Sequence, residues 1–220
     1  MSLAVRSTST AAAQTGATFS VTKPTGTVDG DWLVAFQTAV LSGGTSPTGP
    51  SGWTRTSDIN MGGFQRLLAY TKAASSEPAS WTFNNASGGV SPESSVYCFA
   101  ISGTPSGVDG SAGTSGVSTN AAPGFFETSV ADAIMLAAYA IGTNAGDTIT
   151  PNGVWTAPGT IGGTVEKLAT GYRIQATAGG GPLADLNATI STSMRWGALI
   201  VAIQPPAATA TSSTGTLMGI

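Results

Sequence analysis

DWLVAFQTAV (Asp31–Val40) is the stretch that decides the fold. It is an apolar run with turn residues on both sides, VDG before it and SGG after it. A short continuous apolar run between turn signals is typical of a strand that is covered on both faces. Further along the chain, ADAIMLAAYA (Ala131–Ala140) has the same character. The two runs predict two equivalent central strands.

The segments around these two runs also occur twice and in the same order. GPSGWTRT (Gly49–Thr56) is matched by PNGVWTAP (Pro151–Pro158), and each contains a turn followed by Trp-Thr. Self-similarity at one offset predicts an internal duplication, here of about 102 residues. The landmarks, at offsets of 101 or 102 residues, are Asp31 with Asp132, Trp53 with Trp155, Tyr70 with Tyr172 and Ile101 with Ile203.

Strand patterns dominate both halves, and Gly/Pro/Ser clusters separate them. In the second half we expect an entering strand at FFETS (Phe125–Ser129), matching FSVTK in the first half. We also expect a strand directly after each Trp-containing turn. The remaining predicted strands are Thr18–Lys23, Asp31–Val40, Arg66–Ala74, Ala79–Asn85, Ser94–Gly103, Ala131–Ala140, Ala169–Ala176, Leu186–Ser191 and Trp196–Pro205.

The predicted fold class is therefore all-β, an antiparallel β-sandwich that is jelly-roll-like and built from the duplication. We expect half-repeats at about 17–103 and 123–206 within a sandwich that spans residues 17–206. Residues 1–16 are predicted to be a flexible N-terminal arm and residues 207–220 a flexible C-terminal tail. One large sandwich is favoured, and two small immunoglobulin-sized sandwiches are the alternative. The Gly-rich bridge Ser102–Gly124 would be a crossover in the first case and a linker in the second.

Composition excludes several classes of function. Only 9% of residues are charged, against about 25% in typical proteins. Net charge is −3 and the eight Lys/Arg residues occur singly along the chain, which argues against nucleic-acid binding. The longest apolar run, Ala133–Ile141, is far shorter than the ~20 residues that a membrane helix needs. The N-terminus lacks a signal-peptide pattern, so we expect no membrane insertion.

Few residues suggest catalysis. Histidine is absent, which removes a His-containing triad and the commonest metal ligand. The closest carboxylate pair, Asp29 and Asp31, is typical of turn chemistry, and DGD supplies few of the six to eight oxygens that Ca²⁺ takes. Cys98 lies in an apolar run and is predicted to be a buried apolar residue. We therefore predict no enzyme activity, no catalytic, metal or cofactor-binding residues and no cofactors, and leave binding residues unassigned.

The five tryptophans allow two interpretations. As core residues they would each bury a large apolar surface, which contributes on the order of a few kcal/mol. As exposed residues they would stack on sugar rings of a glycan. We favour the core interpretation. The residues concerned are Trp32, Trp53, Trp81, Trp155 and Trp196.

Taken in order, the motifs of the first half resemble a module of tailed-bacteriophage structural proteins. The resemblance extends over roughly Thr15–Pro206, and the second half repeats the pattern more loosely. Each motif alone is strand and turn chemistry, so the order carries the resemblance. The motifs are VDGDWLVAF, PSGWT, AYTKAA, EPASWTF, FAISG and GVDGS, the last with Asp109.

This resemblance implies a non-enzymatic virion protein, either a capsid decoration or spike protein on the outside of the head or a tail-associated protein. It implies capsid or other virion proteins as partners and a homo-oligomer, for which a trimer is one form. The protein would be made in the host cytoplasm and reside in the virion. The alternative is a tail-associated module that binds a receptor or a host-surface glycan. A hydrolase is a third hypothesis, with no candidate residue pair.

Overall fold

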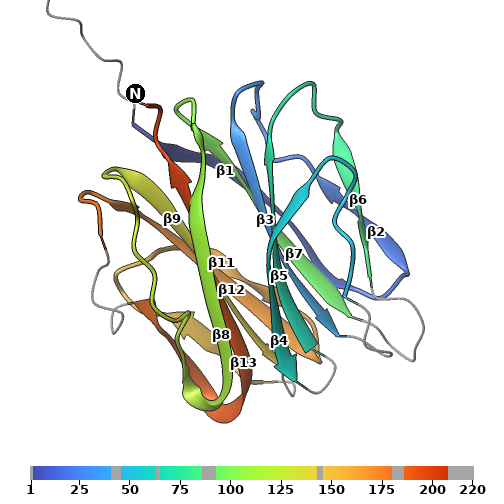
Figure 1. The fold of residues 1–220 in the computed structure, drawn as a ribbon. Helices are drawn as coiled ribbons and strands as arrows, with labels where there is room; N and C mark the ends of the chain where they lie inside the picture. Colours follow the sequence, from blue (N-terminus) through green and yellow to red (C-terminus); the bar gives the residue numbers. More distant parts are fainter. Residues whose placement is uncertain are drawn as a thin grey trace, which may run out of the picture.

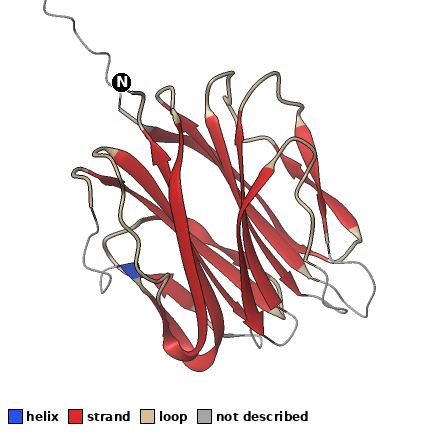
Figure 2. Cartoon of the chain, in the orientation of Figure 1, coloured by secondary structure: helices blue, strands red, loops and turns tan. Residues whose placement is uncertain are grey.

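The computed structural model describes residues 2–40, 46–62, 65–85, 93–142, 146–179 and 186–207. This part of the chain is all-β, and its strands pair antiparallel (Figure 2). The predicted all-β class is confirmed. The strands are β1 (Ala4–Gln14), β2 (Thr18–Thr22), β3 (Trp32–Val40), β4 (Thr54–Gly62), β5 (Gln65–Ala73), β6 (Ser80–Asn84), β7 (Ser94–Ser102), β8 (Gly107–Ala121), β9 (Ala133–Gly142), β10 (Ile149–Pro151), β11 (Thr156–Gly162), β12 (Glu166–Gln175) and β13 (Ala188–Gln204).

Each half of the chain builds one large sheet (Figure 1). The N-terminal sheet has the order β1-β7-β3-β5-β4. The C-terminal sheet has the order β8-β13-β9-β12-β11, with β10 beside the start of β13. Strands β2 and β6 form a small separate sheet. A jelly roll passes strands between its two sheets, so the jelly-roll topology is not confirmed.

The two large sheets face each other across a shared apolar core. Phe36 and Phe99 enter it from the N-terminal sheet, with ring centroids 6.0 Å apart and planes at 80°. Leu136 and Val201 enter it from the C-terminal sheet. A single core shared by the halves is consistent with one sandwich rather than two small ones. It forms because alternate residues of each strand point to the same face.

The outer faces of both large sheets are covered as well. The β2–β6 sheet covers the N-terminal sheet with Phe19 and Phe83. Phe126, Trp155 and Leu186, which lie outside the strands, cover the C-terminal sheet. This double coverage explains why the central strands are continuous apolar runs rather than alternating patterns.

The repeated Trp-containing segments form the same turn. Trp53 N donates to Pro50 O at 3.2 Å, and Trp155 N donates to Asn152 O at 3.1 Å. As predicted, each Trp directly precedes a strand, β4 in one half and β11 in the other. Both indoles pack on the outer face of their own sheet, so neither of them lies in the core between the sheets.

Three segment predictions were wrong. Residues 1–16, expected to be a flexible arm, contain β1, which pairs with β7. The bridge Ser102–Gly124 contains β8, which pairs along β13. FFETS forms no strand, since only an isolated bridge between Thr128 and Gly179 occurs there. β1 and β8 are edge strands whose side chains are mostly exposed or partly exposed, so few of them are apolar.

The start of each half is therefore earlier than predicted. Ala4 pairs with Ser102 at the end of β7, and Gly107 pairs with Gln204 at the end of β13. The first strand of each half thus lies beside the last strand of the same half. The predicted starts at residues 17 and 123 omit these two strands. Of the predicted C-terminal tail 207–220, residues 208–220 lie outside the described residues.

Two of the predicted matches shift by one residue in the paired strands. Gly30 N donates to Ala74 O, and Asp132 N donates to Gln175 O. Both donors have positive φ, 87° and 58°, so Asp132 corresponds to Gly30 rather than to Asp31. Asp is among the few non-glycine residues that adopt this left-handed conformation readily.

Tyr70 likewise corresponds to Gly171 rather than to Tyr172. Tyr70 pairs with Ala35 on β3, and Gly171 pairs with Ala137 on β9. Tyr70 is buried on the outer face of its sheet, whereas Tyr172 packs on the shared core.

Candidate functional site

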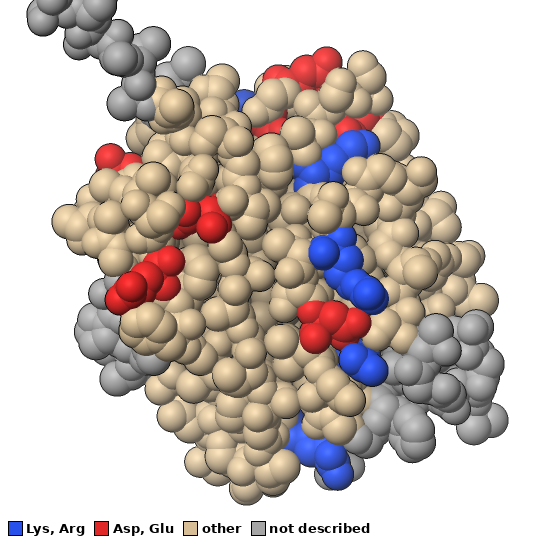
Figure 3. All heavy atoms as spheres, in the orientation of Figure 1, with Lys and Arg blue, Asp and Glu red and all other residues tan. Residues whose placement is uncertain are grey.

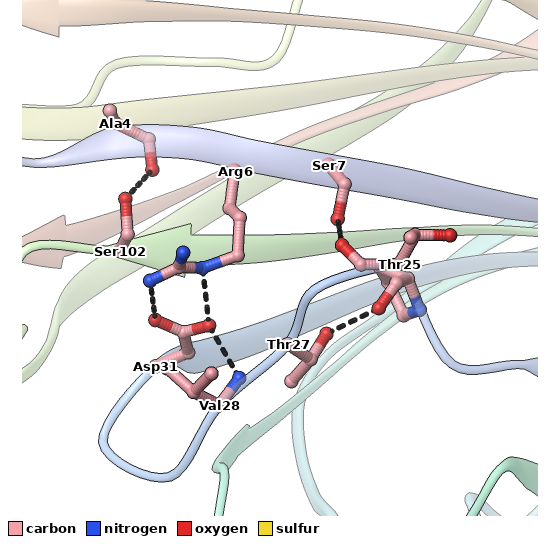
Figure 4. A network of polar contacts seen from close by, with 9 residues as sticks. Ala4, Arg6, Ser7, Thr25, Thr27, Val28, Asp31 and Ser102 are labelled. Carbon is pink, nitrogen blue, oxygen red and sulfur yellow. Dashed lines mark hydrogen bonds and ion pairs between the residues drawn. The ribbon is translucent and has the colours of Figure 1, made fainter.

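The Asp29–Asp31 pair is structural, and Figure 4 shows the contacts of Asp31 with Arg6 and Val28. Asp31 is 3% exposed and accepts two hydrogen bonds from Arg6, Nε to Oδ2 at 2.8 Å and Nη2 to Oδ1 at 3.0 Å. Asp31 Oδ2 also accepts the backbone N–H of Val28 at 3.0 Å. Asp29 instead accepts the N–H of Ser76 at 2.7 Å. Asp31 therefore bonds within its own turn, as predicted, whereas Asp29 bonds the distant turn that contains Ser76.

The Arg6–Asp31 pair fixes β1 against the start of β3. Its hydrogen bond to Asp31 raises the pKa of Arg6. Further along β1, Ser7 Oγ donates to Thr25 O at 2.6 Å and Ser9 Oγ donates to Thr22 O at 2.5 Å. A bidentate arginine–carboxylate contact is geometrically specific. These contacts explain why the N-terminal segment is a strand and not an arm, and sequence patterns alone gave no signal for them.

The other charged residues of the repeated motifs also hold the scaffold. Lys72 of AYTKAA and Trp81 of EPASWTF both donate to Glu77, at 3.0 and 2.9 Å. Burial acts to raise the pKa of Glu77, but the hydrogen bonds from Lys72, Ser75 and Trp81 outweigh it, so this pKa lies below its usual value. The motifs therefore tie β5 to β6.

In the second half, Asp109 of GVDGS binds the segment before β9. It accepts the N–H of Ser129 at 2.7 Å and the amide of Gln204 at 2.8 Å. Arg6 and Asp109 occupy matching β-bulges. On β1 the pairing with β7 passes from Val5 to Ser7 and leaves out Arg6. On β8 the pairing with β13 leaves out Asp109, because Ile203 and Ala202 pair with the residues on either side of it. A bulge re-aims one side chain out of the strand pattern, here toward the neighbouring turn.

The five tryptophans are all at least partly buried. Trp81, Trp155 and Trp196 are 5 to 8% exposed, and Trp32 and Trp53 are half-buried. Trp53 contacts Trp81 edge-to-face at 5.1 Å, and Arg173 lies 5.7 Å from the centre of the Trp155 ring. The burial of Trp81, Trp155 and Trp196 favours the core interpretation for these three.

The basic residues gather in space although they are separate in sequence. Arg55 and Arg66 both contact Asp58, at 3.2 and 3.1 Å, and Lys72 contacts Glu77 on the same side of β5. Figure 3 shows basic atoms in a line on this face of the molecule, with acidic atoms among them. The ion pairs of Arg55, Arg66 and Lys72 partly neutralise these charges.

Two further features of the sequence are Cys98 and the two Asn-x-Ser/Thr triplets that match the glycosylation pattern. Cys98 is fully buried, and burial raises the pKa of its thiol, so the reactive thiolate is disfavoured. The first glycosylation-type triplet begins at Asn85, and its other two residues lie outside the described ranges. The second, Asn187–Thr189, runs into β13.

A hollow of about 740 Å³ opens at one end of the sandwich. Its wall includes Leu3, Val130, Asp132, Ile174 and Pro205, and Ile174 is 45% exposed there. Nothing in the sequence pattern marked this site, because its residues come from five separate segments. It is open and mixed in polarity, so it suits a protein contact better than a small polar substrate.

A buried carboxyl group, that of Glu166, lies between the two sheets. Glu166 is 2% exposed and accepts hydrogen bonds from Thr38 and Ser95 across the two sheets, each at 2.5 Å. Burial raises the pKa of Glu166 to about 7, although the two hydroxyl hydrogen bonds lower it and nearby Glu93 raises it further. Sequence reasoning missed this residue, since a single Glu at the start of a strand gives no signal of burial.

Within the described ranges no group of three or more His, Cys, Asp and Glu side chains could hold a metal ion. The same part of the chain contains no helix long and apolar enough to cross a bilayer. Comparisons of the sequence and the structure with protein-family models, curated proteins and solved structures found no match.

Proposed function

We propose that this chain is a non-enzymatic structural protein of a tailed-phage virion, and specifically a capsid decoration or spike protein bound to the outside of the head. The observation that carries the proposal is that the charged residues of the phage-like motifs hold the fold together. Their charged residues, Asp31, Lys72, Glu77 and Asp109, all bind neighbouring turns and strands. Motifs whose charged residues stabilise the fold are consistent with a protein that has a structural, non-catalytic role.

We also infer that the chain arose by internal duplication of a unit of about 102 residues. The two large sheets share one strand order. A polar side chain of the central strand binds the covering segment in both halves: Gln37 donates to Asn84 O at 2.9 Å, and Tyr139 donates to Leu186 O at 2.5 Å. The matching bulges and Trp turns support the same inference.

The proposed mechanism is adhesion through a rigid surface of low charge. Contacts with the capsid would depend on apolar area and backbone hydrogen bonds more than on ion pairs. The partners are capsid or other virion proteins and further copies of this chain, for which a trimer fits a site on a capsid symmetry axis. Because β1 belongs to the sheet, residues 208–220 are the better candidate for an arm that binds a neighbouring subunit.

Immunogold labelling of purified particles, with an antibody against this chain, tests the proposal. Label over the head is the expected result. Label on no particle would overturn a virion role. A second experiment adds chain that lacks residues 208–220 to particles without this protein. Reduced occupancy of the particles is expected, whereas unchanged occupancy would overturn the arm mechanism alone.

A tail-associated receptor- or glycan-binding module remains the second candidate. The exposed side chain of Phe125, 66% exposed beside the buried Phe126, is the observation that favours it. Label confined to the tail would promote this function. Glycan-dependent quenching of the tryptophans is not expected, because their rings are shielded, so binding should be followed by calorimetry.

A further inference from the structure

The cluster of Thr38, Ser95, Glu93 and Glu166, here called the Glu166 cluster, joins the two halves at one end of the shared core. Thr38 lies on β3 and Ser95 on β7, both in the N-terminal sheet. Glu166 is the first residue of β12 in the C-terminal sheet, opposite Gly142. Both hydroxyls bind the carboxyl group of Glu166. The cluster therefore forms a polar link between the two sheets at this end of the apolar core.

The hydrogen bonds of the cluster have a direction. Thr38 Oγ1 accepts the N–H of Ser95 at 3.2 Å, and Ser95 Oγ accepts the N–H of Ala13 at 2.9 Å. Each hydroxyl can then donate a hydrogen bond to a carboxyl oxygen of Glu166. The Thr38 hydroxyl also lies 3.5 Å from Ser95 O, to which it can turn when the carboxyl group carries a proton. The site can thus satisfy either form of Glu166 in its hydrogen bonds.

The charges around Glu166 oppose its ionised form. Glu93 is 7% exposed, and its Oε1 has no hydrogen-bond partner within the described structure. A Cβ added at Gly163 would overlap this oxygen, so the Glu93 carboxyl group lies against the turn before β12. Two carboxylates in one desolvated site repel each other, which favours retention of a proton.

The nearby cations are engaged elsewhere. Arg66 on β5 lines the small cavity beside Glu166 but pairs with Asp58 at 3.1 Å. Lys167, the next residue on β12, donates to the backbone carbonyl of Asp147. Tyr97, two residues from Ser95 on β7, faces the same core. None of these groups therefore compensates a negative charge on Glu166.

The first half of the chain has a neutral residue at the matching place. Gln65 begins β5 opposite Val40, as Glu166 begins β12 opposite Gly142. A Cβ added at Gly142 would overlap the Gln65 amide, so Gln65 also reaches across to the other sheet. Gln65 and Glu166 line the same small cavity at one end of the shared core, and of these two matching residues only Glu166 can change its charge.

We propose that the Glu166 cluster is a proton-operated latch between the two sheets. With a proton on Glu166 the sheets stay closed at this end, and loss of the proton above neutral pH opens them locally so that water reaches the carboxylates. This goes beyond the proposed virion role and does not depend on it. A chain with this latch would hold its two halves more firmly in acidic than in alkaline solution.

Hydrogen exchange followed by NMR on the full chain tests the latch, because two amides report on it directly. The N–H groups of Ser95 and Ala13 donate to the cluster hydroxyls. After correction for the intrinsic effect of pH, their protection is expected to fall by about tenfold between pH 6 and pH 8.5. Protection that does not change with pH in the wild-type chain would overturn the proposal.

Variants distinguish the latch from a general effect of pH. Glu166→Gln copies the residue of the first half and should make the protection of both amides independent of pH. Glu93→Gln should move the change to lower pH, because it removes a repelling charge. Glu127→Gln, at an exposed position, is the matched control and should behave like wild type. Retention of the wild-type pH dependence in Glu166→Gln would contradict the proposal.

A direct titration covers the case in which Glu166→Gln fails to fold. The side-chain carboxyl carbon of Glu166 can be followed by NMR in the wild-type chain. A midpoint near neutral pH, together with a change in the Ser95 amide at the same pH, supports the latch. A midpoint near that of free glutamate overturns it.

Discussion

The two halves of the molecule build sheets of the same strand order but cover the outer faces of those sheets differently. In the first half the β2–β6 sheet lies over the face, and Tyr70 on β5 fills it from below. In the second half the matching residue is Gly171, and the Trp155 side chain occupies the space above it. The strand order is the same because apolar strands pair through their backbones. The segment that covers the outer face of each sheet differs, because a different aromatic side chain packs there in each half.

The largest effect is expected from Phe83→Ala, which would break the cover of the first half. Phe83 is fully buried and contacts the rings of Phe19, Trp53 and Tyr70, each at 6.1 Å. Loss of the ring should lower the free energy of unfolding by about 3–5 kcal/mol, measured by urea denaturation. Phe125→Ala, at an exposed position in the second half, is the matched control and should cost less than about 0.5 kcal/mol.

The next effect concerns pH and the difference between Gln65 and Glu166. Burial raises the pKa of Glu166 to about 7 in the folded chain, above the ordinary value of 4.5. Since the folded pKa is raised, this contribution to stability is complete below about pH 4.5 and is lost as pH rises through 7. The loss should be on the order of 3 kcal/mol. Urea denaturation of wild type and Glu166→Gln at pH 5 and pH 8.5 measures it, and equal losses in both would contradict the assignment.

Asp31→Asn tests the contact that holds β1 and should lower the free energy of unfolding by about 2–3 kcal/mol. The buried group would lose its charge-assisted pairing with Arg6. Thermal unfolding followed by circular dichroism measures the loss. Asp29→Asn is the control in the same turn, and its cost should be smaller because Asp29 is exposed. Equal effects would mean that the ion pair does not hold the strand.

Gly171→Ala would sharpen the comparison between the two covers. The added Cβ would lie 2.8 Å from Trp155 Cβ and 3.0 Å from its Cγ. Such overpacking costs about 1–3 kcal/mol and should also shift the tryptophan emission. Gly153→Ala is a matched control, because nothing lies within 4 Å of a Cβ at that position. Unchanged stability in both variants would show that Trp155 does not depend on this glycine.

The smallest effect tests the match between Gly30 and Asp132. Gly30→Asp places in the first half the residue of the second, at a φ of 87° with nothing within 4 Å of a Cβ. We expect a cost of about 1 kcal/mol. Asp132→Gly, at a φ of 58°, should be neutral or stabilising by a similar amount. Two changes of the same sign in chemical denaturation would count against the match.

The sequence allowed the central strands to be predicted because their chemistry is local. Asp31–Val40 and Ser94–Gly103 are apolar runs between turns, and they became β3 and β7. The edge strands β1 and β8 were missed because their residues are small and polar. Their pairing depends on partners far along the chain, such as Asp31 for Arg6, which no local pattern reveals.

The sites were harder to predict than the fold. The prediction of local turn chemistry for Asp29 and Asp31 holds for the Val28 N–H contact of Asp31, whereas Asp29 binds Ser76 in a distant turn. Glu166 was missed because its burial depends on Thr38 and Ser95 in the other half. The match of Asp31 with Asp132 was wrong by one residue for a related reason. Identical letters suggested it, whereas backbone conformation and strand pairing decide equivalence.

The end hollow has a consequence for how this chain could be rearranged. Ser2 and Leu3, the junction residue Ser106, and Pro205 with the two residues after it all line it. The chain therefore starts its first half, passes between halves and leaves its second half at one end of the sandwich (Figure 1). A circular permutant that opens near Ser106 and joins residue 207 to residue 2 through a short linker would exchange the order of the halves and keep every strand pair.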